Sequence, residues 1–241
     1  SEEARKIAVK AGKPLGILTF DPHPREFFNP GEPSFRLTPV SRKLSILDSW
    51  AVDFVVDVKF NEELAATTAE NFVSTHLNED LNAFHIVVGH DFAFGKGRRG
   101  NTRTLMQFGY SYNFQVSIVD AQLGSSGGLF SSRAIRELLQ SGRPGEAAKL
   151  LGRWWSVDGV VIRGEKRGRK LGYPTANLRL GDYMQPSLGI YAVWVRVQSL
   201  PSWFKGAASL GVRPTFEGRG VVLEVYLLNF SEDLYDQKIE V

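Results

Sequence analysis

GIYAVWVRVQS, residues 189–199, has a tyrosine or a valine at every second position from Tyr191 to Val197. Successive side chains of a strand point to opposite faces, so Tyr191 and every second residue up to Val197 would share one face. This pattern predicts a strand that is buried on one side. Similar strand-like segments surround it, separated by turns and with little helix between them: SVDGVVIRG (156–164), WFKGAASLGV (203–212), VVLEVYLLNF (221–230) and KIEV (238–241). Such a series predicts an antiparallel barrel or sandwich.

The first half of the chain has a different pattern, in which strand-length apolar runs alternate with segments of helical period. The runs are LGILTF (15–20), DFVVDV (53–58), HIVVGH (85–90) and QVSIVD (115–120), and the helical segments include SRKLSILDSWA (41–51), AENFVSTHL (69–77) and SSRAIRELLQ (131–140). Alternation of this kind predicts a parallel, doubly wound sheet. We therefore expect an α/β, Rossmann-like domain over residues 1–150 and an antiparallel β-barrel domain over residues 155–241, joined by the helical stretch GEAAKLLGRWW (145–155).

The composition excludes several classes of protein. The 241 residues contain no cysteine, which excludes a disulfide framework and thiolate metal sites, and the formal net charge is only +3. No apolar run is long enough to span a bilayer and no signal-peptide pattern occurs, so a cytoplasmic protein that does not contact membranes is the simplest interpretation. The four histidines lack metal-ligand spacing, which favours polar or packing roles over zinc: His23, His76, His85 and His90.

The stretch GEKRGRKLGYPTAN, residues 164–177, pairs a cationic, glycine-rich turn with two neutral oxygen ligands, Thr175 and Asn177. Glycines let backbone amides approach phosphate oxygens, basic side chains offset the phosphate charge, and Mg²⁺ takes few protein oxygens beside substrate phosphates. The candidate phosphate-binding residues are Gly164, Lys166, Arg167 and Gly168. The structural alternative is a solvated basic hairpin followed by a Pro-Thr turn.

Two further segments combine candidate site residues with a structural alternative. Ser131 and Ser132 stand at the predicted start of a helix, where free amides and Arg136 could hold phosphates, although serine is also a common N-cap. The loop GHDFAFGKGRRGN (89–101) offers Phe92 and Phe94 as stacking surfaces for a planar ligand, or as plugs of the sheet edge. In the same loop Asp91 is a hydrogen-bonding group and Gly95 permits close approach.

These motifs resemble a known family in order and spacing. RGxxLGYPTAN, GIYAV, GVRPTF and LEVYLLNFSEDLY closely resemble the riboflavin kinase module of bacterial bifunctional riboflavin kinase/FAD synthetases. The segments LTFDPHP (18–24), RLTP (36–39), VVGHDFAFGKGRRGN (87–101) and FSSRAIR (130–136) are similar to the adenylyltransferase module of that family, which is a nucleotidyltransferase-like domain. The resemblance covers nearly the whole chain.

The resemblance implies a bifunctional enzyme of FAD biosynthesis. Riboflavin and ATP would give FMN, and FMN and a second ATP would give FAD and pyrophosphate, with Mg²⁺ held by Thr175 and Asn177. Strand alternation in VLEVYLLNF puts Leu223, Val225 and Leu227 on one face and Glu224 on the other, and Glu224 matches the family's general base for the ribityl hydroxyl. An exposed strand glutamate paired with a lysine is the structural alternative. Asp21 and His23 in FDPHP become ATP-site residues through the resemblance, and a strand-end turn otherwise explains them.

The chain departs from the family pattern in several places. Arg133 stands where the nucleotidylyltransferase signature usually has a threonine, and His90 is not usual in its loop. The chain opens at SEEARKIAVKAG, after the place where the family has a GxFDGxHxGH segment whose histidines stabilise the transferring phosphate. It ends at Val241, before the family's flavin-covering loop and C-terminal helix. We therefore expect the residues as written to be incomplete for adenylyl transfer.

Two other functions compete with this hypothesis. One is a nucleotidylyltransferase for another acceptor, which PTAN and the later strand motifs disfavour. The other is a basic nucleic-acid-binding protein that uses KGRRGNTR (96–103) and RGEKRGRK (163–170). The basic residues cluster in two glycine-rich loops, which favours small polyphosphates as partners and disfavours nucleic acid. Whether the chain forms a homo-oligomer stays open at this point.

Overall fold

The computed structural model describes residues 2–50, 52–120, 131–163, 174–215 and 218–241. The chain divides into two compact units, one made of Ser1–Glu32 and Lys43–Leu129 and the other of Pro33–Arg42 and Phe130–Val241. The short segment Pro33–Arg42 thus packs with the second half of the chain. This division follows packing, and the predicted domain boundaries at residues 150 and 155 stay predictions. Within the described ranges, no helix is both long and apolar enough to cross a membrane.

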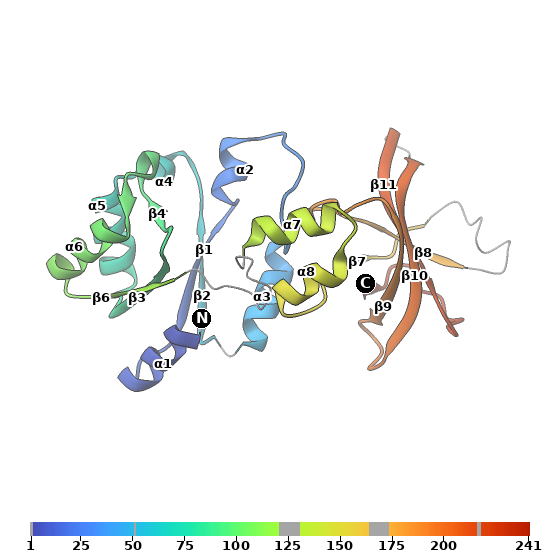
Figure 1. Ribbon diagram of the computed structural model, residues 1–241, viewed down its shortest axis with the longest axis horizontal. Helices are drawn as coiled ribbons and strands as arrows, with labels where there is room; N and C mark the ends of the chain where they lie inside the picture. Colours follow the sequence, from blue (N-terminus) through green and yellow to red (C-terminus); the bar gives the residue numbers. More distant parts are fainter. Residues whose placement is uncertain (1, 51, 121–130, 164–173, 216–217) are drawn as a thin grey trace. The chain divides into compact units, whose positions relative to one another are not determined.

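The first unit contains the four strands that the sequence predicted, and they pair in parallel (Figure 1). β1 (Gly16–Asp21) pairs with β2 (Phe54–Lys59), and β3 (His85–Gly89) pairs with β6 (Gln115–Val119). A short antiparallel pair joins β4 (Ala93–Phe94) to β5 (Gly100–Asn101). The remaining elements are α1 (Glu2–Ala11), α2 (Pro24–Phe28), α3 (Val40–Ser49), α4 (Glu62–Ala66), α5 (Ala69–Asn71), the π-helix η1 (Phe72–Asp80), the 3₁₀-helix η2 (Lys96–Arg98) and α6 (Thr102–Tyr112). The first turn of α3, up to Arg42, belongs to the second unit.

The core of this unit lies between the strands and the helices α5, η1 and α6. Val73 and Leu105 are fully buried there, and Phe72, Phe94 and Phe114 are buried beside them. The expected helix over AENFVSTHL is present as α5 and η1, and its apolar side chains supply much of this core. The alternation of strands and helices therefore gives the predicted α/β arrangement with parallel pairing, but the four strands form two separate two-stranded pairs where a single sheet was predicted.

The second unit is an antiparallel sheet of six strands that is nearly closed into a barrel (Figure 1). Its strand order is β7-β12-β9-β10-β11-β8. The Ile162 amide donates to the Asn177 carbonyl oxygen at 2.8 Å, which links the residues after β7 to β8 and so joins the two ends of the sheet. The strands are β7 (Asp158–Val160), β8 (Thr175–Arg179), β9 (Gly189–Val197), β10 (Trp203–Thr215), β11 (Gly218–Leu227) and β12 (Lys238–Glu240).

The barrel interior confirms the predicted alternation. In β9, Val195 and Val197 are buried, Tyr191 and Val193 are half-buried, and the residues between them are exposed. The helices α7 (Ser132–Gln140) and α8 (Pro144–Leu151) pack together against Met184 and form a second apolar cluster of this unit. The sequence did not predict β8, because PTAN was interpreted as a possible turn.

Candidate active site

Three candidate residues of the kinase half lie together on two neighbouring strands. The register of β8 and β11 places Asn177 opposite Glu224 and Thr175 opposite Tyr226. Residues that face each other in an antiparallel pair point to the same side, with Cβ atoms about 5 Å apart. Thr175 and Asn177 are two positions apart on β8 and also share that side. We call Thr175, Asn177 and Glu224 the β8–β11 row.

The β8–β11 row lies on the face of the sheet that points away from the barrel core. The intervening residues point inward, since Ala176, Leu178, Leu223 and Val225 all belong to the buried apolar cluster. Asn177 is 9% exposed and Thr175 and Glu224 are half-buried, so this face is partly covered. The predicted alternation around Glu224 is confirmed, and the side chain projects from the middle strand of a three-stranded ladder.

The row provides oxygen atoms that suit a hydrated divalent cation. The Asn177 side-chain nitrogen donates to the carbonyl oxygen of Thr175 at 3.4 Å, which turns the amide nitrogen toward its own strand. A threonine hydroxyl and an asparagine oxygen are neutral, hard ligands of the kind that Mg²⁺ uses when phosphates complete its coordination. The donor set therefore fits Mg²⁺ brought to the site with a nucleotide.

Two residues beside the row were not proposed from the sequence. Ser209 on β10 is opposite Glu224 on the side away from Asn177, and it is half-buried. Tyr226 lies opposite Thr175 on β11. Alternation in WFKGAASLGV would have put Ser209 on the outward face, but the pairing register that joins it to Glu224 is a long-range feature.

The phosphate-binding candidates of the glycine-rich turn, Gly164, Lys166, Arg167 and Gly168, lie outside the described residues. Their predicted role therefore stays a prediction.

The helix start near residue 131 shows which contacts its candidate residues already make. The Ser131 hydroxyl oxygen accepts a hydrogen bond from the Ala134 amide at 3.1 Å and caps α7. The Arg136 guanidinium donates to the Phe35 carbonyl oxygen at 2.7 Å and lies 5.0 Å from the Phe35 ring centroid. Ser132, the first residue of the helix, is exposed. Arg133, whose role the sequence left open, pairs with Glu137 one turn later at 2.8 Å.

Asp21 and His23 lie at the end of β1 and have structural roles there. The Asp21 carbonyl oxygen accepts from the Phe60 amide at 3.0 Å. His23 caps α2: its Nδ1 accepts from the Arg25 amide at 3.1 Å, and its own amide donates to Glu26 at 3.3 Å. The end of a parallel strand is also where ligands of α/β sheets bind, so both residues remain candidates for the ATP site.

The loop after β3 holds the flavin-site candidates. The Phe92 and Phe94 rings stack with centroids 5.2 Å apart, but Phe94 is 7% exposed and belongs to the core, whereas Phe92 is half-buried. Gly95 has φ of 70°, and a Cβ there would approach the Ala69 nitrogen to 2.6 Å, so this position needs glycine. Asp91 is exposed.

Comparisons with known proteins place both halves of the chain. Residues 2–134 match the family model described as FAD synthetase, and residues 151–241 match the one described as riboflavin kinase. The chain is 40% identical over 238 residues to the bifunctional riboflavin kinase/FMN adenylyltransferase of Buchnera aphidicola, covering 96% of this chain and 76% of that protein. It is 37% identical over 244 residues to the protein of the same name from Escherichia coli K12, covering 100% of this chain and 75% of that protein.

A solved structure supports the same fold. A crystal structure described as a macrolide-efflux protein from Streptococcus pneumoniae matches with a TM-score of 0.87 and 30% identity, covering 99% of this chain and 77% of that one. The efflux description applies to that protein. For this chain, the two family models and the relatives named above all carry names of flavin enzymes. The chain belongs to the bifunctional riboflavin kinase/FMN adenylyltransferase family and is an enzyme of FAD biosynthesis, with a nucleotidyltransferase-type domain followed by a riboflavin kinase barrel.

Proposed function

We propose that the β8–β11 row is the phosphoryl-transfer site of the riboflavin kinase reaction. The observation that carries the proposal is the register that sets Asn177 directly opposite Glu224, with Thr175 on the same face. In this proposal Glu224 is the general base and the oxygens of Thr175 and Asn177 hold Mg²⁺. Riboflavin, FMN and ATP are the small molecules that the family's two reactions use.

The proposed step moves one proton and one phosphoryl group. The Glu224 carboxylate accepts the proton of the terminal ribityl hydroxyl while that oxygen attacks the γ-phosphorus of ATP. The bond from the γ-phosphorus to the β,γ-bridging oxygen breaks, and ADP leaves. Bound Mg²⁺ would neutralise charge on the phosphates. A base on a central strand is held by ladders on both sides, which fixes the backbone from which its side chain projects.

The remaining sites are proposals of the same kind. Gly164, Lys166, Arg167 and Gly168 would contact ATP phosphates in the kinase reaction. In the adenylyltransferase reaction, Asp21, His23, Ser131, Ser132 and Arg136 would serve ATP. Asp91, Phe92 and Gly95 would serve FMN, and Phe94 would support the Phe92 ring from the core. A cytoplasmic location and the absence of a nucleic-acid partner also stay predictions, and the oligomeric state stays open.

The metal-ligand assignment is tested by matched substitutions at Thr175. Thr175→Val removes the hydroxyl oxygen at nearly constant volume, and Thr175→Ser keeps it. We expect Thr175→Val to raise the Mg²⁺ concentration for half-maximal FMN formation about tenfold or more, as one lost oxygen ligand implies. Asn177→Leu should behave in the same way, and Thr175→Ser should stay within about threefold of the wild type.

FAD formation from supplied FMN is the internal control, because it belongs to the other reaction. It is measured, like every FAD formation below, in a protein that also carries the family's GxFDGxHxGH segment. Equal Mg²⁺ requirements in Thr175→Val and wild type would refute the assignment. If Thr175→Val loses both activities, its thermal unfolding temperature shows whether it is folded. If it is unfolded, Asn177→Leu takes its place in the test.

A further inference from the structure

The segment Pro33–Arg42 lies within the FAD synthetase match of the sequence but packs with the kinase unit. The Met184 amide donates to the Arg36 carbonyl oxygen at 2.8 Å, in a parallel bridge between Arg36 and Tyr183. The Trp155 indole nitrogen donates to the Leu37 carbonyl oxygen at 2.8 Å. Backbone groups of the segment therefore act as an extra edge of the barrel unit.

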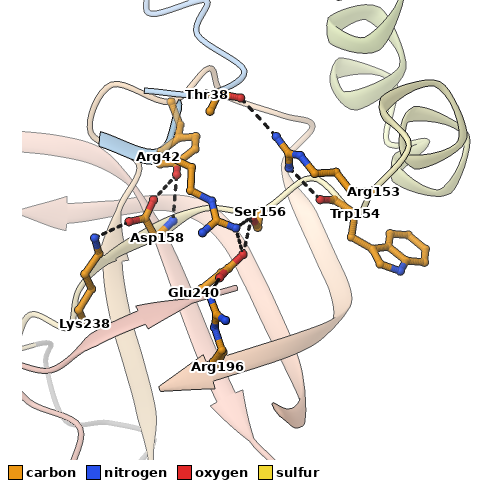
Figure 2. A network of polar contacts seen from close by, with 10 residues as sticks. Thr38, Arg42, Arg153, Trp154, Ser156, Asp158, Arg196, Lys238 and Glu240 are labelled. Atoms are coloured by element: carbon orange, nitrogen blue, oxygen red, sulfur yellow. Dashed lines mark hydrogen bonds and ion pairs between the residues drawn. The ribbon is translucent and has the colours of Figure 1, made fainter. Parts of the chain in front are cut away.

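A buried polar network fixes the far end of this segment (Figure 2). Glu240 on β12 is 8% exposed, and its carboxylate accepts from Arg42, from the Ser156 hydroxyl at 2.9 Å and from Arg196 at 2.7 Å. A carboxylate buried to this degree needs paired donors, because an unpaired buried charge is strongly destabilising. Arg42 thus ties the segment to the barrel.

The near end of the segment forms a wall of a cavity of about 410 Å³. The Ser34 hydroxyl donates to the Asp182 carbonyl oxygen, which holds this end against the turn after β8. Pro33 and Ser34 line the cavity together with residues of β8, β11 and the turn after β8: Arg179, Leu180, Gly181, Tyr183, Gln185, Gly220, Val221 and Val222. Ligand pockets of proteins commonly fall between about 300 and 1,000 Å³, so the space suits a small organic molecule.

The cavity begins one step along the strands from the β8–β11 row. Arg179 is opposite Val222 in the same ladder that sets Asn177 opposite Glu224. Two residues along a strand span about 7 Å, so Arg179 and Val222, which line the cavity, follow the row on its outward face. A molecule with a phosphate at the row would extend its other end toward Arg179 and Ser34.

The lining combines apolar walls with a few polar groups. Val222 and Pro33 contribute apolar surface, while Arg179 provides a cation and Gln185 a carboxamide. This mixture suits an aromatic heterocycle that carries hydrogen-bonding edges and a sugar. The adenosine portion of the phosphoryl donor has that chemistry.

We propose that Pro33 and Ser34, contributed by the adenylyltransferase part of the sequence, are specificity-determining residues of the kinase reaction because they wall the cavity that takes the adenosine portion of ATP. The inference rests on the proposed function of the β8–β11 row. Its consequence is that the segment Pro33–Arg42 takes part in the kinase reaction, although the riboflavin kinase match begins only at residue 151.

The test compares Ser34→Leu, which fills the cavity, with Ser34→Ala, which removes the hydroxyl without filling it. In FMN formation we expect Ser34→Leu to raise the KM for ATP about tenfold with kcat within about twofold, and Ser34→Ala to stay within about threefold. Inhibition of the same reaction by fragments of ATP measures the binding of the adenosine end and of the phosphate end separately. The inhibition constant of adenosine should rise in Ser34→Leu, and that of inorganic tripolyphosphate should not change.

An unchanged KM for ATP in Ser34→Leu, in a variant with the thermal unfolding temperature of the wild type, would overturn the inference. Asn177→Leu distinguishes this failure from a failure of the proposed function. Wild-type FMN formation by Asn177→Leu would refute the proposed role of the β8–β11 row. Impaired FMN formation by Asn177→Leu, together with a wild-type KM for ATP in Ser34→Leu, would refute only the assignment of the cavity. If Ser34→Leu does not fold, Ser34→Thr keeps the hydroxyl and adds one methyl group. Its KM for ATP should rise about tenfold, and a KM within about threefold of the wild type would overturn the inference.

Discussion

The candidate residues of the two units differ in the structural contacts that their side chains already make. In the kinase unit, Asn177 and Glu224 sit on rigid neighbouring strands and point to one face, and their place is set by the ladder. In the other unit, His23 caps α2 and Phe94 fills the core, so these residues have structural roles as well. The difference suggests that a residue on a strand ladder can be assigned from geometry, whereas a residue on a loop needs a variant that keeps its structural role.

The largest expected effect is at Glu224. Glu224→Gln keeps the shape of the side chain and removes the base, so FMN formation should fall by about 10²–10⁴-fold while riboflavin binding stays within a few-fold. Chromatographic separation of riboflavin, FMN and FAD measures the first, and flavin fluorescence titration measures the second. A kcat near that of the wild type would show that another group takes the proton.

A smaller effect is expected at His23, where the structural and catalytic roles can be separated. Asparagine is a good N-cap, so His23→Asn should leave the unfolding temperature unchanged and lower FAD formation from FMN about tenfold. His76→Asn is a matched histidine control in the same unit. Wild-type adenylylation by His23→Asn would show that His23 only caps α2 and has no role in the reaction.

The two phenylalanines of the loop after β3 should respond differently. Phe92→Leu should raise the KM for FMN in adenylylation about fivefold, because its half-buried ring can contact a ligand. Phe94→Leu should instead lower the free energy of unfolding by about 1 kcal/mol, because that ring is buried. Kinetics and urea unfolding of both variants check this, and the reverse pattern would exchange the two roles.

The smallest effect concerns the hydrogen bond between Tyr183 and Asp158 in the barrel unit. Burial and the hydrogen bond to Asp158 raise the pKa of Tyr183. Burial opposes ionisation of Asp158, but its bonds from Lys238 and Tyr183 outweigh this and lower the pKa of Asp158. Tyr183→Phe should therefore cost about 1 kcal/mol of unfolding free energy at neutral pH.

The pH dependence of that cost follows from the two directions. The contribution of Tyr183 is present below its unfolded pKa, near 10, and is lost as pH rises further. The contribution of Asp158 is present above its unfolded pKa, near 4, and is lost as pH falls. Urea unfolding of wild type and Tyr183→Phe should differ most between about pH 5 and 9, and a constant difference from pH 3 to 11 would contradict this account.

Local patterns predicted much of the fold, and long-range pairing explains what they missed. The strands β1, β2, β3 and β6 were predicted from strand-length apolar runs, and alternation predicted the outward face of Glu224. The strand β8 was missed because a short segment with Pro174 and Asn177 resembles a turn, and it becomes a strand by pairing with β11. The packing of Pro33–Arg42 on the barrel was also missed, since the partners of Arg42 lie more than a hundred residues away in the sequence.

The central claim is that the β8–β11 row holds the metal–nucleotide complex of the kinase reaction. Its most direct test is paramagnetic broadening of backbone amide resonances when Mn²⁺·ADP is added with riboflavin. Within the barrel unit we expect the strongest broadening at Asn177 and Glu224, and its loss in Asn177→Leu. Broadening centred on other residues of the barrel unit, or unchanged in Asn177→Leu, would contradict the claim.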